Sequence, residues 1–243
     1  MQHSSTTTDD QRDAIPRLLV KMRTMVLSFD GPVCALSPAL SSLAAAEHMR
    51  AVVAAAGHEV PPDLEDVDDP LIVMRYAVTL DDPGLTWDTE HALMRLEWEA
   101  MTVAVPTPGA HEAIRAARAG AKGVAIASDR SGWVIEQYLA LHGLTDLMSR
   151  PIGRWSLDPQ RWKPDTYSLL AGVQQTSARP KSTLFVGSTP IDVETASAAQ
   201  VPFLGLAGPR SSAEGLRSAG AEHVLGSDGM LLLAAALRGP AGD

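Results

Sequence analysis

Apolar runs typical of buried strands alternate along most of the chain with apolar residues at helical spacing. The runs predict strands at 25–29, 121–128, 182–188, 201–207 and 221–226, and a short strand or a loop at 150–155. The helical spacing predicts helices at 110–119, 132–142, 164–172, 190–199, 212–219 and 229–238. Strands that alternate with helices of this length predict an α/β fold with a doubly wound parallel sheet.

Residues 37–103 show no strand pattern. Helical spacing predicts helices at 38–56, 70–78 and 86–103, with Asp82-Pro83-Gly84 as a turn. We therefore expect an all-helical insertion at 37–103 in an α/β core made of 17–36 and 104–243. The polar segment 1–16 is expected to be a disordered tail.

Composition narrows the class of protein. Apolar residues make up 45% of the 243 residues, enough for a full core without disulfides. The net charge of −9 and the lack of a Lys/Arg cluster argue against nucleic acid as a partner. Cys34 is the only cysteine, no apolar run approaches the roughly 18 residues of a membrane span, and the first ten residues lack the apolar core of a signal peptide. These features predict a cytoplasmic protein that does not bind membranes, in which Cys34 is a buried bystander.

The first candidate functional residue follows the end of the first predicted strand. Asp30 follows the apolar run from Met25 and is followed by Gly31-Pro32. In open α/β sheets, ligands bind just beyond the carboxyl ends of the strands, so we expect Asp30 to point into the functional site. Further chemical groups lie at later strand ends or helix starts: Ser128, Asp129, Lys163 and the segment Gly187-Ser188-Thr189-Pro190-Ile191-Asp192.

These segments resemble, in order, the four motifs of the haloacid dehalogenase (HAD) superfamily. The resemblance covers nearly the whole chain and is closest to hydrolases of the phosphoglycolate-phosphatase type. It implies a Rossmann-like core with a helical cap inserted after the first strand, here 37–103. In that family, a first-motif Asp attacks phosphorus, a second Asp acts as general acid and base, and Mg²⁺ is held by the nucleophile, a backbone carbonyl and a fourth-motif Asp.

Two positions depart from the family pattern. Ser28 stands where the family has its nucleophilic Asp, and Ser188 where it has an Asp that binds the metal. A hard cation that prefers charged oxygens loses most of its protein ligands, so we expect no cofactor and at most weak Mg²⁺ binding. The resemblance implies that Ser128 and Lys163 bind a phosphoryl group. As a loop residue, Lys163 is expected to contribute little to the stability of the core.

Several assignments remain open at this stage. Ser28 is either a substitute nucleophile or an inert residue, and we favour the inert interpretation because serine needs an adjacent base. Asp192 is a site residue, the third helical position of a capping box that starts at Thr189, or both. Asp129 either binds ligand or only closes a turn.

Two functions follow from these observations. The first is a HAD-like protein without standard Mg²⁺-dependent phosphatase activity, a pseudoenzyme that binds a small anionic or phosphorylated ligand, or a protein partner. The alternative is a metal-independent enzyme, a hydrolase or other acid/base catalyst, that uses Asp30 on a substrate held by Lys163 and Ser128. A smaller possibility is residual phosphatase activity through Ser28 or a water molecule.

Overall fold

The computed structural model describes residues 9–36, 40–155, 157–208 and 210–239. Six parallel strands form the sheet, in the order β5-β4-β1-β6-β7-β8. Their bounds are β1 Thr24–Leu27, β4 Gly123–Ser131, β5 Ile152–Arg154, β6 Thr183–Gly187, β7 Phe203–Leu206 and β8 Val224–Leu225. A separate antiparallel pair joins β2 (Cys34–Ala35) to β3 (Val105–Pro106). The predicted parallel α/β sheet is confirmed.

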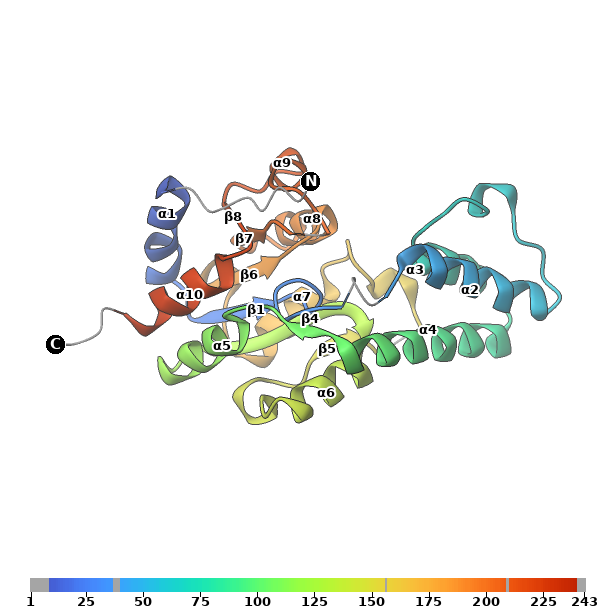
Figure 1. The fold of residues 1–243 in the computed structure, drawn as a ribbon, viewed down its shortest axis with the longest axis horizontal. Coiled ribbons are helices and arrows are strands. Elements are labelled where there is room, and N and C mark those ends of the chain that lie inside the picture. The colour runs from blue at the N-terminus through green and yellow to red at the C-terminus, as the bar shows by residue number, and fades with distance from the viewer. Residues whose placement is uncertain (1–8, 37–39, 156, 209, 240–243) are drawn as a thin grey trace.

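Helices cover both faces of this sheet (Figure 1). They are α1 Asp9–Val20, α5 Ala110–Ala119, α6 Gly132–Leu141, α7 Tyr167–Gln175, α8 Pro190–Ala198, α9 Ala213–Ser218 and α10 Gly229–Arg238. Short 3₁₀ turns occur at Pro62–Leu64, Thr145–Leu147, Pro159–Arg161 and Pro180–Ser182. Alternate residues of a strand point to opposite faces. Met25 and Leu27 accordingly join one core with α5, α6 and α10, whereas Val26 joins another with α7 and α8.

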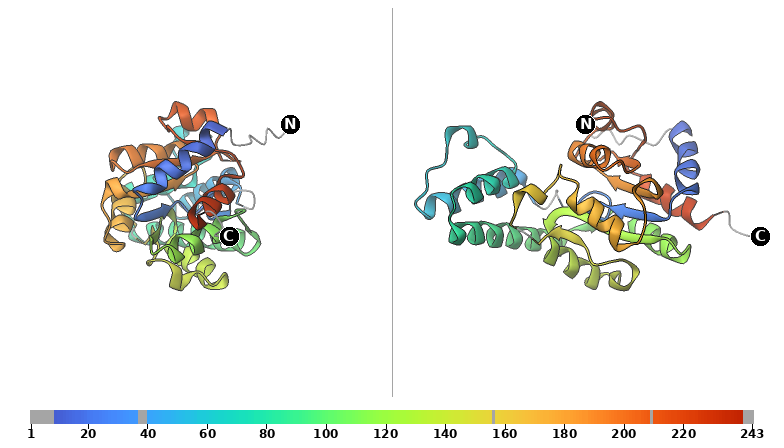
Figure 2. Two further views of the ribbon diagram at one scale, coloured as in Figure 1. Left: turned by 90° about the vertical axis from the view of Figure 1, so that its left-hand side faces the viewer. Right: turned by 180° about the vertical axis from the view of Figure 1, so that it is seen from behind.

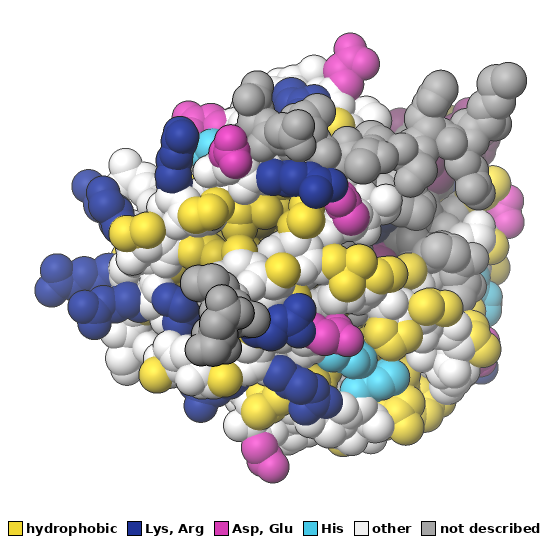
Figure 3. All heavy atoms as spheres, turned by 60° about the vertical axis from the view of Figure 1, so that its left-hand side comes forward, with side chains coloured by type: hydrophobic (Ala, Val, Ile, Leu, Met, Phe, Trp, Pro, Cys, Tyr) yellow, Lys and Arg dark blue, Asp and Glu magenta, His cyan; other side chains and the backbone are white. Residues whose placement is uncertain are grey.

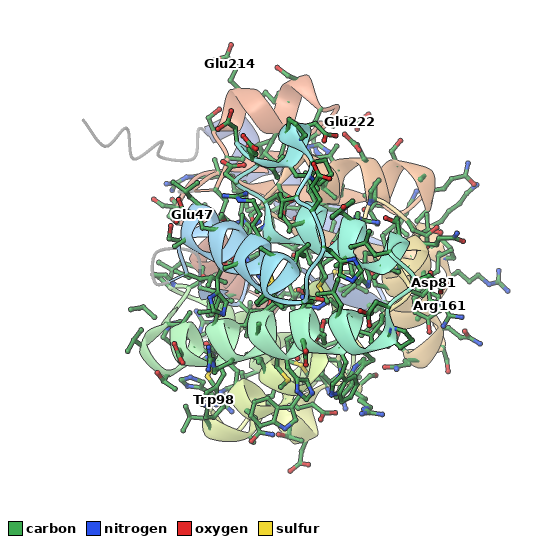
Figure 4. The ribbon with its side chains drawn as sticks, turned by 90° about the vertical axis from the view of Figure 1, so that its right-hand side faces the viewer. Glu47, Asp81, Trp98, Arg161, Glu214 and Glu222 are labelled. Carbon is green, nitrogen blue, oxygen red and sulfur yellow. The ribbon has the colours of Figure 1, made fainter. Side chains whose placement is uncertain are left out.

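The predicted helical insertion follows β2 and contains α2 Ser42–Ala55, α3 Pro70–Thr79 and α4 Pro83–Val103. These helices extend from one end of the sheet, as Figures 1 and 2 show. The last part of α4 returns to the sheet domain, where Trp98 packs against Trp133 of α6 with ring centroids 5.0 Å apart. Figure 4 views the insertion end on, with Trp98 on the side of α4 toward α6.

Three expectations about element boundaries were wrong. The expected disordered tail is helical from Asp9 onward because Ile15 and Leu19 of α1 are buried in the core; residues 1–8 of that tail lie outside the described residues. Asp82 is the N-cap of α4, its carboxylate accepting a hydrogen bond from Leu85 N, so Pro83-Gly84 begins a helix. The α7 helix begins at Tyr167, which leaves residues 163–166 as a connection beside the strand ends.

The surface mixes charge and apolar area. On the face shown in Figure 3, apolar side chains lie between several Lys and Arg side chains, and Asp or Glu side chains lie beside some of them. Within the described ranges, no helix has the length and apolar character needed to cross a membrane.

Candidate functional site

The turn after β1 brings the first and fourth motifs into contact. Gly31 has a φ of 108°, and a Cβ on it would lie 2.3 Å from Ser188 Oγ, so only glycine fits this position. The Ser188 hydroxyl donates a hydrogen bond of 3.0 Å to the backbone carbonyl of Asp30. Ser188 therefore contacts the motif-one backbone directly.

A buried ion pair joins Lys163 to Asp192 across the same region. Lys163 Nζ lies 2.7 Å from Asp192 Oδ1 and also donates to Ser28 Oγ at 3.3 Å. Lys163 is 6% exposed and Asp192 2% exposed. The ammonium of Lys163 is enclosed and compensates a buried carboxylate, so we expect Lys163 to contribute more to stability than its loop position alone indicates. Lys163, Asp192 and Ser28 thus form one cluster.

Asp192 belongs to the capping box of α8 and also lines the cavity beside Lys163. Thr189 caps α8 with its hydroxyl, and Asp192 Oδ2 accepts from the backbone N–H groups of Thr189 at 3.1 Å and Ser188 at 3.0 Å. Burial acts to raise the pKa of Asp192, but the charge and hydrogen bond of Lys163, with the backbone N–H of Ser188 and the hydroxyl of Thr189, lower it overall. The helix cap therefore holds an ionised carboxylate against Lys163.

Asp30 lies between two arginines that the sequence analysis did not single out. Its Oδ2 accepts from Arg130 Nη2 at 2.8 Å and from Arg210 Nη1, while its Oδ1 accepts from Leu36 N at 3.0 Å. Arg130 follows Ser128 at the end of β4, so its nearness to the second motif was a usable signal. Arg210 is 180 positions from Asp30, and no local pattern marks it.

Ser128 and Asp129 shape the site through backbone contacts. Ser128 Oγ accepts from Arg130 N at 3.1 Å, and Asp129 Oδ1 accepts from Lys163 N at 3.1 Å. Burial raises the pKa of Asp129, and the charge of Lys163 offsets this only in part. Asp129 therefore connects the β4 turn to the loop that carries Lys163, which is more than the closure of a turn.

A chain of buried charges connects this site to α4. Arg154 Nε lies 2.6 Å from Glu90 Oε2, and Arg154 Nη2 lies 3.1 Å from Glu97 Oε2. Glu97 also lies 3.6 Å from the Arg130 guanidinium that binds Asp30. Burial acts to lower the pKa of Arg130, but Asp30 and Glu97 raise it overall. Glu97 therefore fixes Arg130 from the side of the helical insertion.

These side chains surround a polar cavity of about 270 Å³. Ser28, Asp30, Ser128, Asp129, Lys163 and Asp192 all line it, together with Arg130 and Arg210. The helical insertion closes the opposite side with Ser42 and residues 68–71. The structure thus brings the predicted site residues to one cavity, apart from Ser188, which lies just behind Asp30.

The residues at the family's metal position do not fit Mg²⁺. The groups there are the Ser28 and Ser188 hydroxyls and the Asp30 carbonyl, which already accepts from Ser188. Asp192, the nearest carboxylate of the fourth motif, is occupied by Lys163 and by backbone donors. Among the described residues, no three His, Cys, Asp or Glu side chains are grouped to hold a metal ion. Mg²⁺ prefers charged oxygens in an octahedral arrangement, which this set does not supply.

Comparisons with known proteins agree on the type of fold. A family model described as haloacid dehalogenase-like hydrolase matches residues 79–206. No curated protein matches the chain by sequence.

Three solved structures illustrate the similarity of the fold. A predicted phosphoglycolate phosphatase from Haemophilus somnus is 16% identical, with a TM-score of 0.63, 88% of this chain and 99% of that one covered. A HAD family hydrolase from Deinococcus radiodurans, with bound phosphate and sodium, is 24% identical, with a TM-score of 0.59 and coverage of 91% and 99%. CbbY from Rhodobacter sphaeroides in complex with phosphate is 15% identical, with a TM-score of 0.61 and coverage of 84% and 93%.

Proposed function

Since this chain belongs to the haloacid dehalogenase-like hydrolase family, we propose that it is a non-standard member that binds a small anionic ligand in the polar cavity. It does so without Mg²⁺-dependent aspartyl-phosphate chemistry. The ligand is a phosphorylated or carboxylated small molecule. Lys163, Ser128, Arg130 and Arg210 are the groups proposed to recognise it.

The contact between Lys163 and Ser28 is the observation that carries this proposal. At the position of the family's carboxylate nucleophile stands a hydroxyl, 3.3 Å from an ammonium group. That ammonium is in turn 2.7 Å from Asp192. A serine nucleophile needs a neighbour that accepts its proton, and a lysine paired with a carboxylate is a proton donor. This arrangement supports an inert Ser28.

Cationic side chains inside the cavity support anion binding. Lys163, Arg130 and Arg210 line the cavity. Five carboxylates line it as well: Asp30, Asp68, Asp69, Asp129 and Asp192. An incoming anion therefore has to replace a carboxylate as the partner of one of these cations. Lys163 is buried and the Arg130 side chain is 14% exposed. Burial lowers the local dielectric, so charge contacts are stronger there than at an open surface. Structural neighbours from Rhodobacter sphaeroides and Deinococcus radiodurans hold phosphate, which is consistent with an anionic ligand for this fold.

Metal-independent catalysis through Asp30 has less support. A general acid or base exchanges a proton with its substrate and must be able to reach it. Asp30 Oδ2 is held by two guanidinium groups and Oδ1 by a backbone N–H, so both oxygens already have donors. These contacts favour a structural and electrostatic role for Asp30.

The test combines ligand binding with an activity assay. Isothermal titration with inorganic phosphate, sulfate, sugar phosphates and carboxylates is expected to find at least one saturable ligand. Because Lys163 compensates the buried charge of Asp192, we would use Ser128→Ala and Arg210→Gln as the site variants, with the exposed Arg217→Gln as the matched control. The site variants should weaken binding at least tenfold, and the control should leave it unchanged.

Hydrolysis of p-nitrophenyl phosphate and other phosphomonoesters should equal the buffer rate with and without Mg²⁺. Turnover by the wild type that Ser28→Ala abolishes would contradict the proposal. So would a failure of every anion to bind, or equal binding by the site variants and wild type.

A further inference from the structure

A second cavity, of about 200 Å³, lies on the other side of Asp30. Its wall comes from the β2–β3 pair, from the ends of β7 and β8, and from the first turn of α10. Its apolar lining residues include Ala35, Val105, Pro106, Leu206, Ala207 and Met230. An apolar cavity with a few charged groups at one side is the usual form of a small-molecule site.

The Asp30–Arg210 ion pair separates the apolar cavity from the polar one. These two residues line both cavities. The Arg210 side chain is 30% exposed, whereas that of Asp30 is 4% exposed. Arg210 is therefore the partner with freedom to turn, and it has an anion site on one side and an apolar space on the other.

Asp30 would not be left unpaired if Arg210 turned away from it. Its Oδ2 would keep the hydrogen bond from Arg130, and its Oδ1 would keep the one from Leu36 N. Arg130 itself is held in place by Glu97. An incoming anion that takes over the Arg210 guanidinium thus breaks one contact of the Asp30 carboxylate and leaves those from Arg130 and Leu36 N in place.

We infer that the ligand of this protein is an oxyanion with a compact apolar body. This inference rests on the proposed function and extends it by naming the class of ligand. The anionic head lies in the polar cavity and binds Arg210 in place of Asp30, and the body occupies the apolar cavity. A volume of 200 Å³ corresponds to roughly six water-sized volumes, so the body has about four to six carbon atoms.

Titration calorimetry with two homologous series tests this inference. Inorganic, methyl and butyl phosphate form one series, and acetate and pentanoate form the other, so that the head group and the body vary separately. Burial of each methylene is worth a factor of about four in affinity. Butyl phosphate or pentanoate should therefore bind at least tenfold more tightly than the shortest member of its series, and butanol alone should not bind.

Two variants test where the apolar body and the anionic head of the ligand bind. Val105→Trp places a large side chain at the mouth of the apolar cavity, and because Val105 is 66% exposed, the core is not disturbed. This change should remove the advantage of the longer chain and leave the affinity for inorganic phosphate within twofold. Val103→Trp, at a 68% exposed position that does not line the cavity, is the control. Arg210→Gln should weaken every member of both series.

The outcomes separate this inference from the proposed function. If inorganic phosphate binds but longer bodies bring no gain, the inference is wrong and the proposed function stands. A gain that persists in Val105→Trp also overturns it, since the body would then lie elsewhere. If no anion binds at all, the proposed function fails and the inference fails with it.

Discussion

Lys163 and Asp192, 29 positions apart, form an ion pair of 2.7 Å in which both residues are almost fully buried. Both residues line the polar cavity, and other residues hold each of them in place. Asp129 binds the backbone of Lys163, and the first turn of α8 binds Asp192. The site is thus part of the structural framework, and changes in it affect stability as well as binding.

Removal of one partner of this pair should be costly. We expect Lys163→Ala to lower the free energy of unfolding by about 3–5 kcal/mol, because Asp192 would keep a buried charge without its cation. Urea unfolding measures this, and the exposed Lys181→Ala is the control. The double variant Lys163→Met/Asp192→Leu should lose less than Lys163→Ala alone, since no uncompensated charge remains. If Lys163→Ala lowers the free energy of unfolding by less than about 1 kcal/mol, the Lys163–Asp192 ion pair is not formed in solution.

Low pH should lower the free energy of unfolding, because Asp192 becomes protonated. The pKa of Asp192 is lower in the folded state than its ordinary value of 3.8, so its ionised form favours folding. That contribution is complete above pH 3.8 and is lost as pH falls through the lower folded pKa. The unfolding free energy of the wild type should therefore fall more steeply below pH 4 than that of Asp192→Asn. Equal slopes in the two proteins would contradict this assignment.

Mg²⁺ should not bind tightly to the native protein. Titration with millimolar MgCl₂ is expected to give no saturable heat, because Ser28 and Ser188 replace carboxylate ligands. A dissociation constant below roughly 1 mM, about −4 kcal/mol of binding free energy, would overturn this expectation. Ser28→Asp/Ser188→Asp is the complementary variant. It should gain saturable Mg²⁺ binding, since its carboxylates would flank the Asp30 carbonyl that Ser188 now contacts.

Glu97 should stabilise the protein by joining α4 to the charged residues of the site. Its carboxylate accepts from Ser131 N at 2.8 Å and from Arg154 at 3.1 Å, and it is fully buried. Glu97→Gln would leave the buried Arg154 and Arg130 with less negative charge, so we expect a loss of about 3 kcal/mol in urea unfolding. Glu99→Gln, on the exposed side of the same helix, should change stability by less than about 0.5 kcal/mol. Similar losses in both variants would refute a specific role for Glu97.

The periodic patterns of the sequence were sufficient for most of the fold. Alternating strands and helices predicted the parallel sheet, and the bounds of α5 and α10 agree with the predicted helices. The start of α7 was wrong because Pro164 was interpreted as a first helical residue. In the structure, the preceding residue Lys163 has its backbone N–H bound by Asp129 and its side chain by Asp192, so the segment is held as a loop.

By itself, the sequence determined which chemical groups stand at the strand ends, because an apolar run and the turn after it are local features. It therefore identified Ser28, Asp30, Ser128 and Asp192 as residues that share one edge of the sheet. Tertiary structure alone decided which charges meet, since Arg210 reaches Asp30 across 180 positions and Arg154 reaches Glu97 across 57. Such pairs leave no periodic trace along the chain, because the energy of a charge pair depends on its distance and burial in the folded molecule and not on the separation of its partners in sequence.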